Sequence, residues 1–414
     1  MNYKLMLRTL GRTLQLEALC LLLPLVVCLI YREDPKPFLY TIGLVGVLGC
    51  LIAPVCEELM FRRMLLERLR PWGEGFAVVG LIWVFLSLFG ALPFWFSGEF
   101  ASFADCFFEI VSGFTTTGAS ILTEVESLPR GILFWRSFSS WIGGMGVLIF
   151  TLAFLPKVGG RTQVLVQAEA TGPVSNKLVP KTALSARILY LIYISLTLLE
   201  ILALCLAGMP FYDAVVNTFA TVCTGGFSVR NLSIASYGLP ACEVIITVFM
   251  LLCSLNFAVF FLVLTGRLRQ ALGSDELRFF LLAVALSSAI VFFNVLPLYE
   301  SAGHALRDTL FQVSSVVSTT GFSTADFALW PTVSQFVLVL LMFLGGCAGS
   351  TAGGLKASRV LLLLRCARRS LRRLSHPRAV KVVKLDGKAV DEETLNTVFV
   401  FFTCFFLVLG GTCL

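Results

Sequence analysis

Charged residues are scarce in this 414-residue chain: they make up 14% of it, whereas 57% of the residues are hydrophobic. A soluble domain has about a quarter of its residues charged. The apolar residues fall into nine blocks, most of them near the roughly 20 residues that a membrane-spanning helix requires. These blocks are 13–31, 38–56, 76–96, 131–155, 184–208, 241–265, 279–297, 333–364 and 395–414. The sequence therefore predicts an all-α, multi-pass membrane protein and excludes a soluble enzyme.

Histidine and paired cysteines are also rare. The chain has two histidines, His304 and His376, and thirteen cysteines, none of which forms a Cys-x-x-Cys pair. Little is therefore available for a histidine-based catalytic centre, a zinc site or a disulfide framework. A membrane-embedded enzyme would need ionisable groups that converge within the spans, but Glu17, Glu200 and Glu243 are scattered along the sequence. We predict no enzymatic activity and no cofactor.

The chain lacks a small-residue cleavage site after its first apolar block, which favours a retained helix over a cleaved signal peptide. With the N-terminus inside, the inner segments hold 25 Lys and Arg residues and the outer segments hold 5. This bias predicts a cytoplasmic N-terminus in the cytoplasmic (inner) membrane, and it explains the net charge without nucleic acid. The basic run at 365–378 follows a span directly. It is interpreted as an anchor on anionic lipid, as a docking surface for a cytoplasmic partner, or as both.

Three outer segments align without gaps and form an internal repeat. Each begins with an aspartate (Asp105, Asp213 or Asp308) and fits D-x(10)-T-[TG]-G-[AF]-S. The segments read DCFFEIVSGFTTTGAS, DAVVNTFATVCTGGFS and DTLFQVSSVVSTTGFS, at 105–120, 213–228 and 308–323. The repeat changes the expected fold from a plain helical bundle to repeated helix–pore-loop–helix units.

The repeated segments have the chemistry of a cation filter. The aspartate can cap a helix of about ten residues, which is too short to span a membrane. Glycine at the end of that helix permits backbone angles that aim carbonyl groups at a dehydrated cation. The alternative, that Thr-Thr-Gly merely ends a loop, explains one copy better than three in one register. The predicted filter residues are Thr116, Thr117, Gly118, Thr224, Gly225, Gly226, Thr319, Thr320 and Gly321.

Glycine is unusually dense in the span that follows Pro331, where 345–354 reads GGCAGSTAGG. Each glycine costs a helix about 1 kcal/mol relative to alanine, so we predict an unwound stretch that acts as a movable gate. Close helix packing by small residues is the main alternative. A phosphate loop is a poor match because no Gly-Lys-Ser/Thr ending and no strand is present. The GGMG sequence at 143–146 is interpreted as close packing. The predicted gate residues are Gly345, Gly346, Gly349, Ser350, Thr351, Gly353 and Gly354.

Together these motifs resemble the Trk/Ktr/HKT family of potassium transporters, in the form of its TrkH/TrkG-type membrane subunit. TTTGAS, CTGGFS and STTGFS are similar to its filter loops, GGCAGSTAGGLK to its intramembrane gating loop, and HPRAV at 376–380 to the segment after it. The resemblance implies four units around one pore, potassium as the transported metal ion, a homodimer, and a cytosolic nucleotide-binding regulatory partner of the TrkA kind. It leaves open whether transport is passive or a symport with a proton or sodium ion.

The resemblance also divides the chain. We expect an N-terminal helix pair and cytoplasmic loop, three pore units of which the third has a broken second helix, a basic cytoplasmic segment, and the first helix of a fourth unit; the ranges are 1–75, 76–155, 183–265, 279–364, 365–394 and 395–414. The spacing places a fourth filter glycine near position 437, so the fourth pore loop is expected to be absent. The chain is then a fragment of a longer protein, or a truncated product with a non-conducting or regulatory role.

Overall fold

The computed structural model describes residues 3–61, 71–146, 182–376 and 382–413, which are mostly helical. The chain forms two compact units. Of the described residues, the first unit contains those up to Cys242 and the second contains those from Glu243 onward.

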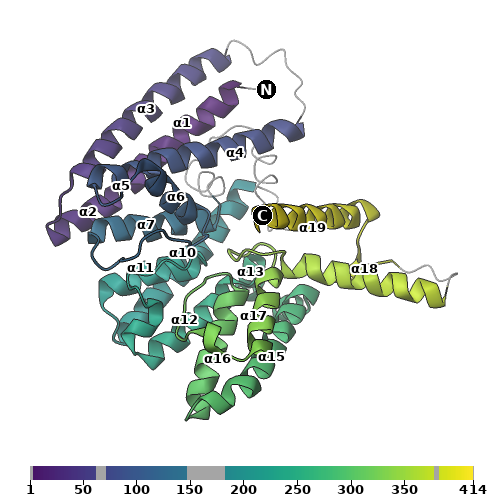
Figure 1. Cartoon of the computed structure of the whole chain (residues 1–414). Coiled ribbons are helices and arrows are strands. Elements are labelled where there is room, and N and C mark those ends of the chain that lie inside the picture. Colours follow the sequence, from purple (N-terminus) through teal and green to yellow (C-terminus); the bar gives the residue numbers. More distant parts are fainter. Residues whose placement is uncertain (1–2, 62–70, 147–181, 377–381, 414) are drawn as a thin grey trace. The chain divides into compact units, whose positions relative to one another are not determined.

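The first unit contains two of the repeated segments. The long helices α1 and α3 lie against each other along their length (Figure 1), with Leu14 and Ala18 packed on Val45. The elements are α1 (Tyr3–Cys20), α2 (Leu22–Tyr31), α3 (Lys36–Phe61), α4 (Pro71–Gly90), α5 (Leu92–Ser97), α6 (Phe103–Phe114), α7 (Arg130–Gly144), α10 (Thr182–Leu206), α11 (Phe211–Val222) and the 3₁₀ turn η1 (Ser233–Tyr237).

The second unit contains the third repeated segment. Its core joins α15, α16 and α17, which lie side by side in Figure 1, and includes Val291, Val313 and Leu338. The elements are α12 (Pro240–Cys253, which begins at the boundary), α13 (Phe257–Leu264), α14 (Leu268–Leu272), α15 (Asp275–Val295), η2 (Leu296–Leu298), α16 (Ala302–Val317), η3 (Phe327–Leu329), α17 (Thr332–Leu344), α18 (Ala357–Ser375), β1 (Lys384–Leu385), β2 (Lys388–Ala389) and α19 (Glu392–Cys413).

Five helical stretches in the described part of the chain are long and apolar enough to cross a membrane, and these are Thr9–Tyr31, Val79–Ser97, Ala186–Leu206, Asp275–Leu298 and Glu392–Cys413. The bent pair α12–α13 would make a sixth. With so many apolar helices, several of which expose leucine and phenylalanine along their length, the molecule is a multi-pass membrane protein.

The apolar block at 241–265, expected as one span, is not one continuous helix. Helix α12 ends at Cys253, α13 begins at Phe257, and the two axes differ by 93°. Asn256 explains part of the break, since its side chain accepts a hydrogen bond from the Ala258 N–H (2.9 Å) and so starts a new helix. The uniform hydrophobicity of the block hid this capping residue.

The glycine-rich stretch after α17 is not helical. Helix α17 ends at Leu344 and α18 begins at Ala357. Helix α18 then carries the basic run as far as Ser375, and a short hairpin of β1 and β2 follows. Arg365 on α18 donates to Asp275 at the start of α15 (2.9 Å), so the beginning of α15 is tied to α18.

Candidate functional site

The three repeated segments end their helices in the same register. Helices α6, α11 and α16 end at Phe114, Val222 and Val317, each nine residues after the repeat's aspartate. Two residues later the chain turns left-handed in all three, at Thr116, Thr224 and Thr319, where φ is 55°, 56° and 57°. The sequence repeat is therefore a repeat of backbone geometry as well.

Each turn has the hydrogen bonds of a Schellman motif. In the first segment the Thr116 N–H donates to the Gly113 carbonyl (2.8 Å) and the Thr117 N–H to the Ser112 carbonyl (2.9 Å). The same two bonds recur in the other segments, as Thr224 to Thr221 (3.0 Å), Gly225 to Ala220 (2.8 Å), Thr319 to Val316 (3.1 Å) and Thr320 to Ser315 (2.9 Å). These bonds use the last carbonyls of the helix. The carbonyl groups of the residues after the turn are therefore not hydrogen-bonded within the helix.

A threonine in the left-handed position is unusual. This position in a Schellman motif is normally filled by glycine, and a β-branched residue there is an outlier. The strain is of the order of 1–3 kcal/mol per residue. The same strained conformation occurs at three equivalent positions of the chain. This recurrence indicates a functional site and not an ordinary loop end.

The glycine two residues further on is also left-handed in each segment. Gly118, Gly226 and Gly321 have φ of 74°, 75° and 84°. A Cβ on Gly118 would lie 2.1 Å from the Gly225 carbonyl oxygen, so the first and second segments approach each other closely. A Cβ on Gly321 would meet no atom within 4 Å. The three glycines thus share a backbone conformation but differ in how tightly they are enclosed.

The repeat's aspartate lies in the first turn of its helix in two segments and not in the third, and it takes part in capping only in the first. Asp105 forms a capping box with Ser102, and Asp213 lies in the first turn of α11. Helix α16 begins six residues before Asp308, which corrects the prediction that this residue opens the helix. Asp308 instead accepts hydrogen bonds from Tyr299 (3.0 Å) and Thr324 (3.4 Å). Burial, reinforced by the Asp308 charge, raises the pKa of Tyr299 to about 12.

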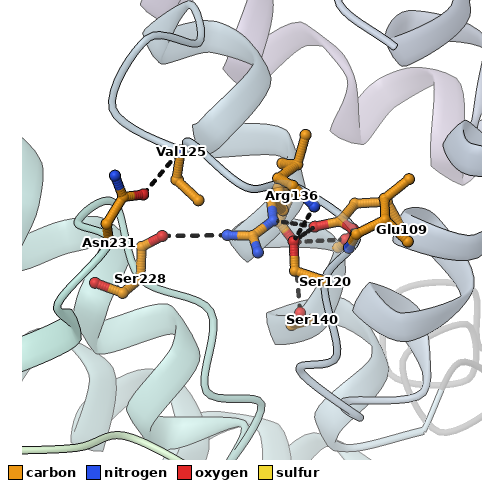
Figure 2. A network of polar contacts seen from close by, with 10 residues as sticks. Glu109, Ser120, Val125, Arg136, Ser140, Ser228 and Asn231 are labelled. Atoms are coloured by element: carbon orange, nitrogen blue, oxygen red, sulfur yellow. Dashed lines mark hydrogen bonds and ion pairs between the residues drawn. The ribbon is translucent and has the colours of Figure 1, made fainter. Parts of the chain in front are cut away.

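A buried ion pair lies behind the first two segments (Figure 2), and the sequence analysis missed it. Glu109 on α6 accepts a hydrogen bond from Arg136 Nε on α7 at 2.5 Å. Only 4% of the Arg136 side chain is exposed and none of the Glu109 side chain. A signal was available in the repeat, because the fourth residue after each aspartate is polar: Glu109, Asn217 and Gln312.

The glycine-rich segment between α17 and α18 fills the break between α12 and α13. The Cys347 N–H donates to the Ser254 carbonyl (2.8 Å), and the Phe257 N–H donates to the Gly349 carbonyl (3.0 Å). Thr351 Oγ1 adds a bond to the Cys253 carbonyl (3.1 Å). The α12–α13 break and the glycine-rich segment thus supply hydrogen-bond partners for each other's non-helical backbone groups. Such groups need partners in a low-dielectric environment.

Two further contacts hold this segment. Glu276 on α15 accepts from the N–H group of Ala348 (2.6 Å), in the segment, and from that of Ser358 (3.1 Å), in the first turn of α18. The Gly353 N–H donates to Thr319 Oγ1 at 2.7 Å, which joins the segment to the third repeat. Lys356, buried and left-handed at φ 72°, donates to the Ala352 carbonyl.

Close packing explains part of the glycine content. A Cβ on Gly345 would lie 2.2 Å from the Gly353 carbonyl oxygen, and one on Gly354 would lie 2.7 Å from the Gly345 Cα. At 143–144 the glycines serve packing, as interpreted: a Cβ on Gly143 would lie 1.9 Å from the Phe114 carbonyl oxygen, and one on Gly144 would lie 2.6 Å from the Cys223 Cβ. Glycines of the 345–354 segment combine close packing with left-handed turns.

Metal-ligating side chains do not gather in the residues that the structure describes, where no group of three His, Cys, Asp or Glu could hold a metal ion. His304 pairs with Asp308 (3.3 Å). At the three turns, 116–118, 224–226 and 319–321, the polar atoms are instead those of the backbone and of threonine hydroxyls. Such groups can replace the water around an ion of low charge density, and do not bind a transition metal tightly.

Repeated short helices that end in Thr-Gly turns, in a multi-pass membrane protein, indicate an ion transporter, and comparison with known proteins gives the particular family. The family model for TrkH, described as cation transport protein, matches residues 69–414. This chain belongs to the TrkH family.

Relatives match nearly the whole chain. The Trk system potassium uptake protein TrkH of Salmonella typhimurium is 38% identical, over 99% of this chain and 84% of that protein. The protein TrkG of Escherichia coli is 36% identical, over 97% of this chain and 84% of its own length. The crystal structure of the potassium transporter TrkH from Vibrio parahaemolyticus has a TM-score of 0.85 and 34% identity, and the match covers 99% of this chain and 84% of that one.

Proposed function

We propose that this chain is the membrane subunit of a Trk-type system that takes potassium up across the cytoplasmic membrane. The observation that carries the proposal is the left-handed threonine that follows a short apolar helix in all three repeats. Each helix presents its partly negative end to the turn, and the carbonyls beyond it are free to face a cation. The relatives are potassium uptake proteins by name, and transporters, so no enzymatic activity is proposed.

We assign the filter to the Thr-Thr-Gly and Thr-Gly-Gly turns of the three repeats, at 116–118, 224–226 and 319–321. Each turn is taken as the pore loop of one helix–pore-loop–helix unit, with units at 76–155, 183–265 and 279–364. The common register of the helix ends and the equal φ angles support one role for all three. A single short turn of this kind per unit offers fewer carbonyl rings than a longer filter, so we expect modest discrimination against sodium.

We assign the gate to 345–354, the segment between α17 and α18. Its support is the contact with the third filter turn through Thr319 and Gly353, which joins the two functional parts by one hydrogen bond. Left-handed Gly345, Gly349 and Gly354 give the segment the backbone freedom that rearrangement needs.

The remaining assignments concern surroundings and partners. We propose an inner-membrane protein with a cytoplasmic N-terminus, assembled as a homodimer with a TrkA-like cytosolic subunit. Helix α18 combines exposed arginines with exposed Leu371 and Leu374 (66% and 80%), which suits the surface of an anionic membrane and leaves its end available to the cytosolic partner. Whether potassium moves alone or by symport is tested by imposing a proton or sodium gradient on the flux.

The test is growth at low potassium of cells that lack their own potassium uptake systems. The expressed protein should restore growth and potassium uptake, and Gly226→Val should abolish both because the left-handed turn is lost. Membrane insertion of each variant is verified by extraction as folded protein. Folded, inserted wild-type protein that supports no potassium uptake would overturn the proposed function.

A further inference from the structure

The ion pair of Glu109 and Arg136 is costly to bury, so its partners are informative. Both side chains are almost fully enclosed, in a block of apolar helices. Removing two charges from water costs more than their attraction returns unless further hydrogen bonds complete the pair. The further bonds therefore show what this pair holds in place.

Glu109 holds the chain that leaves the first filter turn. Its Oε1 accepts from Ser120 Oγ (2.9 Å) and its Oε2 accepts from the Ile121 N–H (3.2 Å), as Figure 2 shows for Ser120. Ser120 comes two residues after Gly118. The carboxylate thus fixes the exit from the first turn.

Arg136 holds the corresponding part of the second filter turn. Its Nη1 donates to the Ser228 carbonyl (3.1 Å), and its guanidinium carbon lies 3.6 Å from the centre of the Phe227 ring. Ser228 comes two residues after Gly226, as Ser120 does after Gly118. One ion pair therefore holds equivalent points of two different repeats (Figure 2).

The other repeats show why a charge is needed here. Gln312, in the third repeat, donates to the Ala325 carbonyl (3.0 Å) beyond its own turn, and Asn217, in the second, donates to the Tyr237 hydroxyl (3.0 Å). A neutral amide is enough to hold a segment of the same repeat. Glu109 alone carries a charge at this position, and it faces an arginine that reaches the neighbouring repeat.

We propose that Glu109 and Arg136 are positioning residues that set the spacing of the first two filter turns, and through it the selectivity among monovalent cations. The close approach of Gly118 to the Gly225 carbonyl makes that spacing sensitive to small displacements. The inference rests on the proposed filter. The pair itself lies behind the turns and need not touch the ion.

The test compares potassium, rubidium and sodium flux in proteoliposomes, normalised to folded protein. Glu109→Gln combined with Arg136→Gln removes both charges and leaves polar side chains, of the same size as Glu at position 109 and shorter than Arg at position 136. One lost bond shifts a local equilibrium by up to roughly tenfold, so we expect the sodium-to-potassium flux ratio to rise by about threefold to tenfold. Ser120→Ala, a milder change that removes one bond to Glu109, should shift the ratio in the same direction by less.

A matched control is the pair of Glu243 and Arg307, whose atoms are equally close (2.5 Å) on α12 and α16. Glu243→Gln with Arg307→Gln should leave the flux ratio unchanged. A pair with a merely structural role would lower the yield and the flux of all three ions together. An unchanged ratio in folded Ser120→Ala and double-variant protein overturns the inference, whereas wild-type protein without potassium flux overturns the proposed function instead.

Discussion

Replacing Thr319 by valine tests whether the hydrogen bond between the third filter turn and the gate segment keeps the gate closed. The Thr319 hydroxyl accepts the Gly353 N–H at 2.7 Å, and its backbone forms the left-handed filter turn. Valine keeps the branched Cβ, so the turn carries the same strain, and only the hydroxyl is lost. The change therefore removes a hydrogen bond that joins the filter turn to the 345–354 segment.

The size of the effect follows from the environment of that bond. Gly353 is exposed, so water can replace the lost partner. A neutral hydrogen bond then contributes about 0.5–1.5 kcal/mol net, which shifts the equilibrium between closed and open segment by about twofold to tenfold towards open. The potassium flux should rise by that factor, and the potassium-to-sodium ratio should stay unchanged because the carbonyls are untouched.

The assay is potassium uptake into proteoliposomes per folded transporter. Thr319→Ser keeps the hydroxyl and should behave as wild type. Thr224→Val is the matched control, because the Thr224 hydroxyl occupies the same place in the second turn and donates to the Cys223 carbonyl (2.7 Å). No increase in Thr319→Val, or an equal increase in Thr224→Val, refutes the link between the third turn and the gate.

Three further predictions test the filter, the anchor of the gate and the topology. Gly118→Ala should lower potassium selectivity and yield sharply, since its Cβ would lie 2.1 Å from the Gly225 carbonyl oxygen. Gly321→Ala, whose Cβ would meet open space, should cost only about 1 kcal/mol of backbone strain. Flux ratios and thermal unfolding of both variants test this. Glu276→Gln weakens two charge-assisted bonds, so the free energy of unfolding should fall by about 1–2 kcal/mol and potassium flux should rise; equal stability and flux would contradict the anchor. In a cysteine-free background, Arg373→Cys should react with an impermeant thiol reagent only from the cytoplasm and Ser236→Cys only from outside, and labelling of position 373 from outside would reverse the orientation.

Much of the fold was readable from the sequence because its signals are local. Apolar length predicts the spans, and a turn that recurs every time at Thr-Thr-Gly or Thr-Gly-Gly can be found by aligning the chain with itself. Glycine density predicted an interruption before Lys356, where α17 and α18 are in fact separate. These features depend on residues within one helix or one turn.

What escaped the sequence depends on partners far apart in the chain. Arg136 contacts Ser228 across 92 residues, and no pattern within either segment announces the bond. The bend at Asn256 could not be predicted because the block at 241–265 is hydrophobic on both sides of it. Its backbone groups find their partners in the 345–354 segment, which is distant in sequence. The repeat predicted that Asp308 lies at the start of a helix, as Asp105 and Asp213 do. The Asp308 carboxylate instead accepts hydrogen bonds from Tyr299 and Thr324.

The shared hydrogen bonds between the α12–α13 break and the 345–354 segment have a mechanical consequence. The segment cannot swing away alone, because Ser254, Phe257 and Cys253 would lose their backbone partners inside the membrane. The backbone at the α12–α13 bend must change conformation whenever the 345–354 segment moves, so the movements of the two are coupled. A genetic screen for hyperactive potassium uptake should therefore return substitutions at the 253–257 bend as often as at the segment itself, although the bend supplies no residue to the proposed filter.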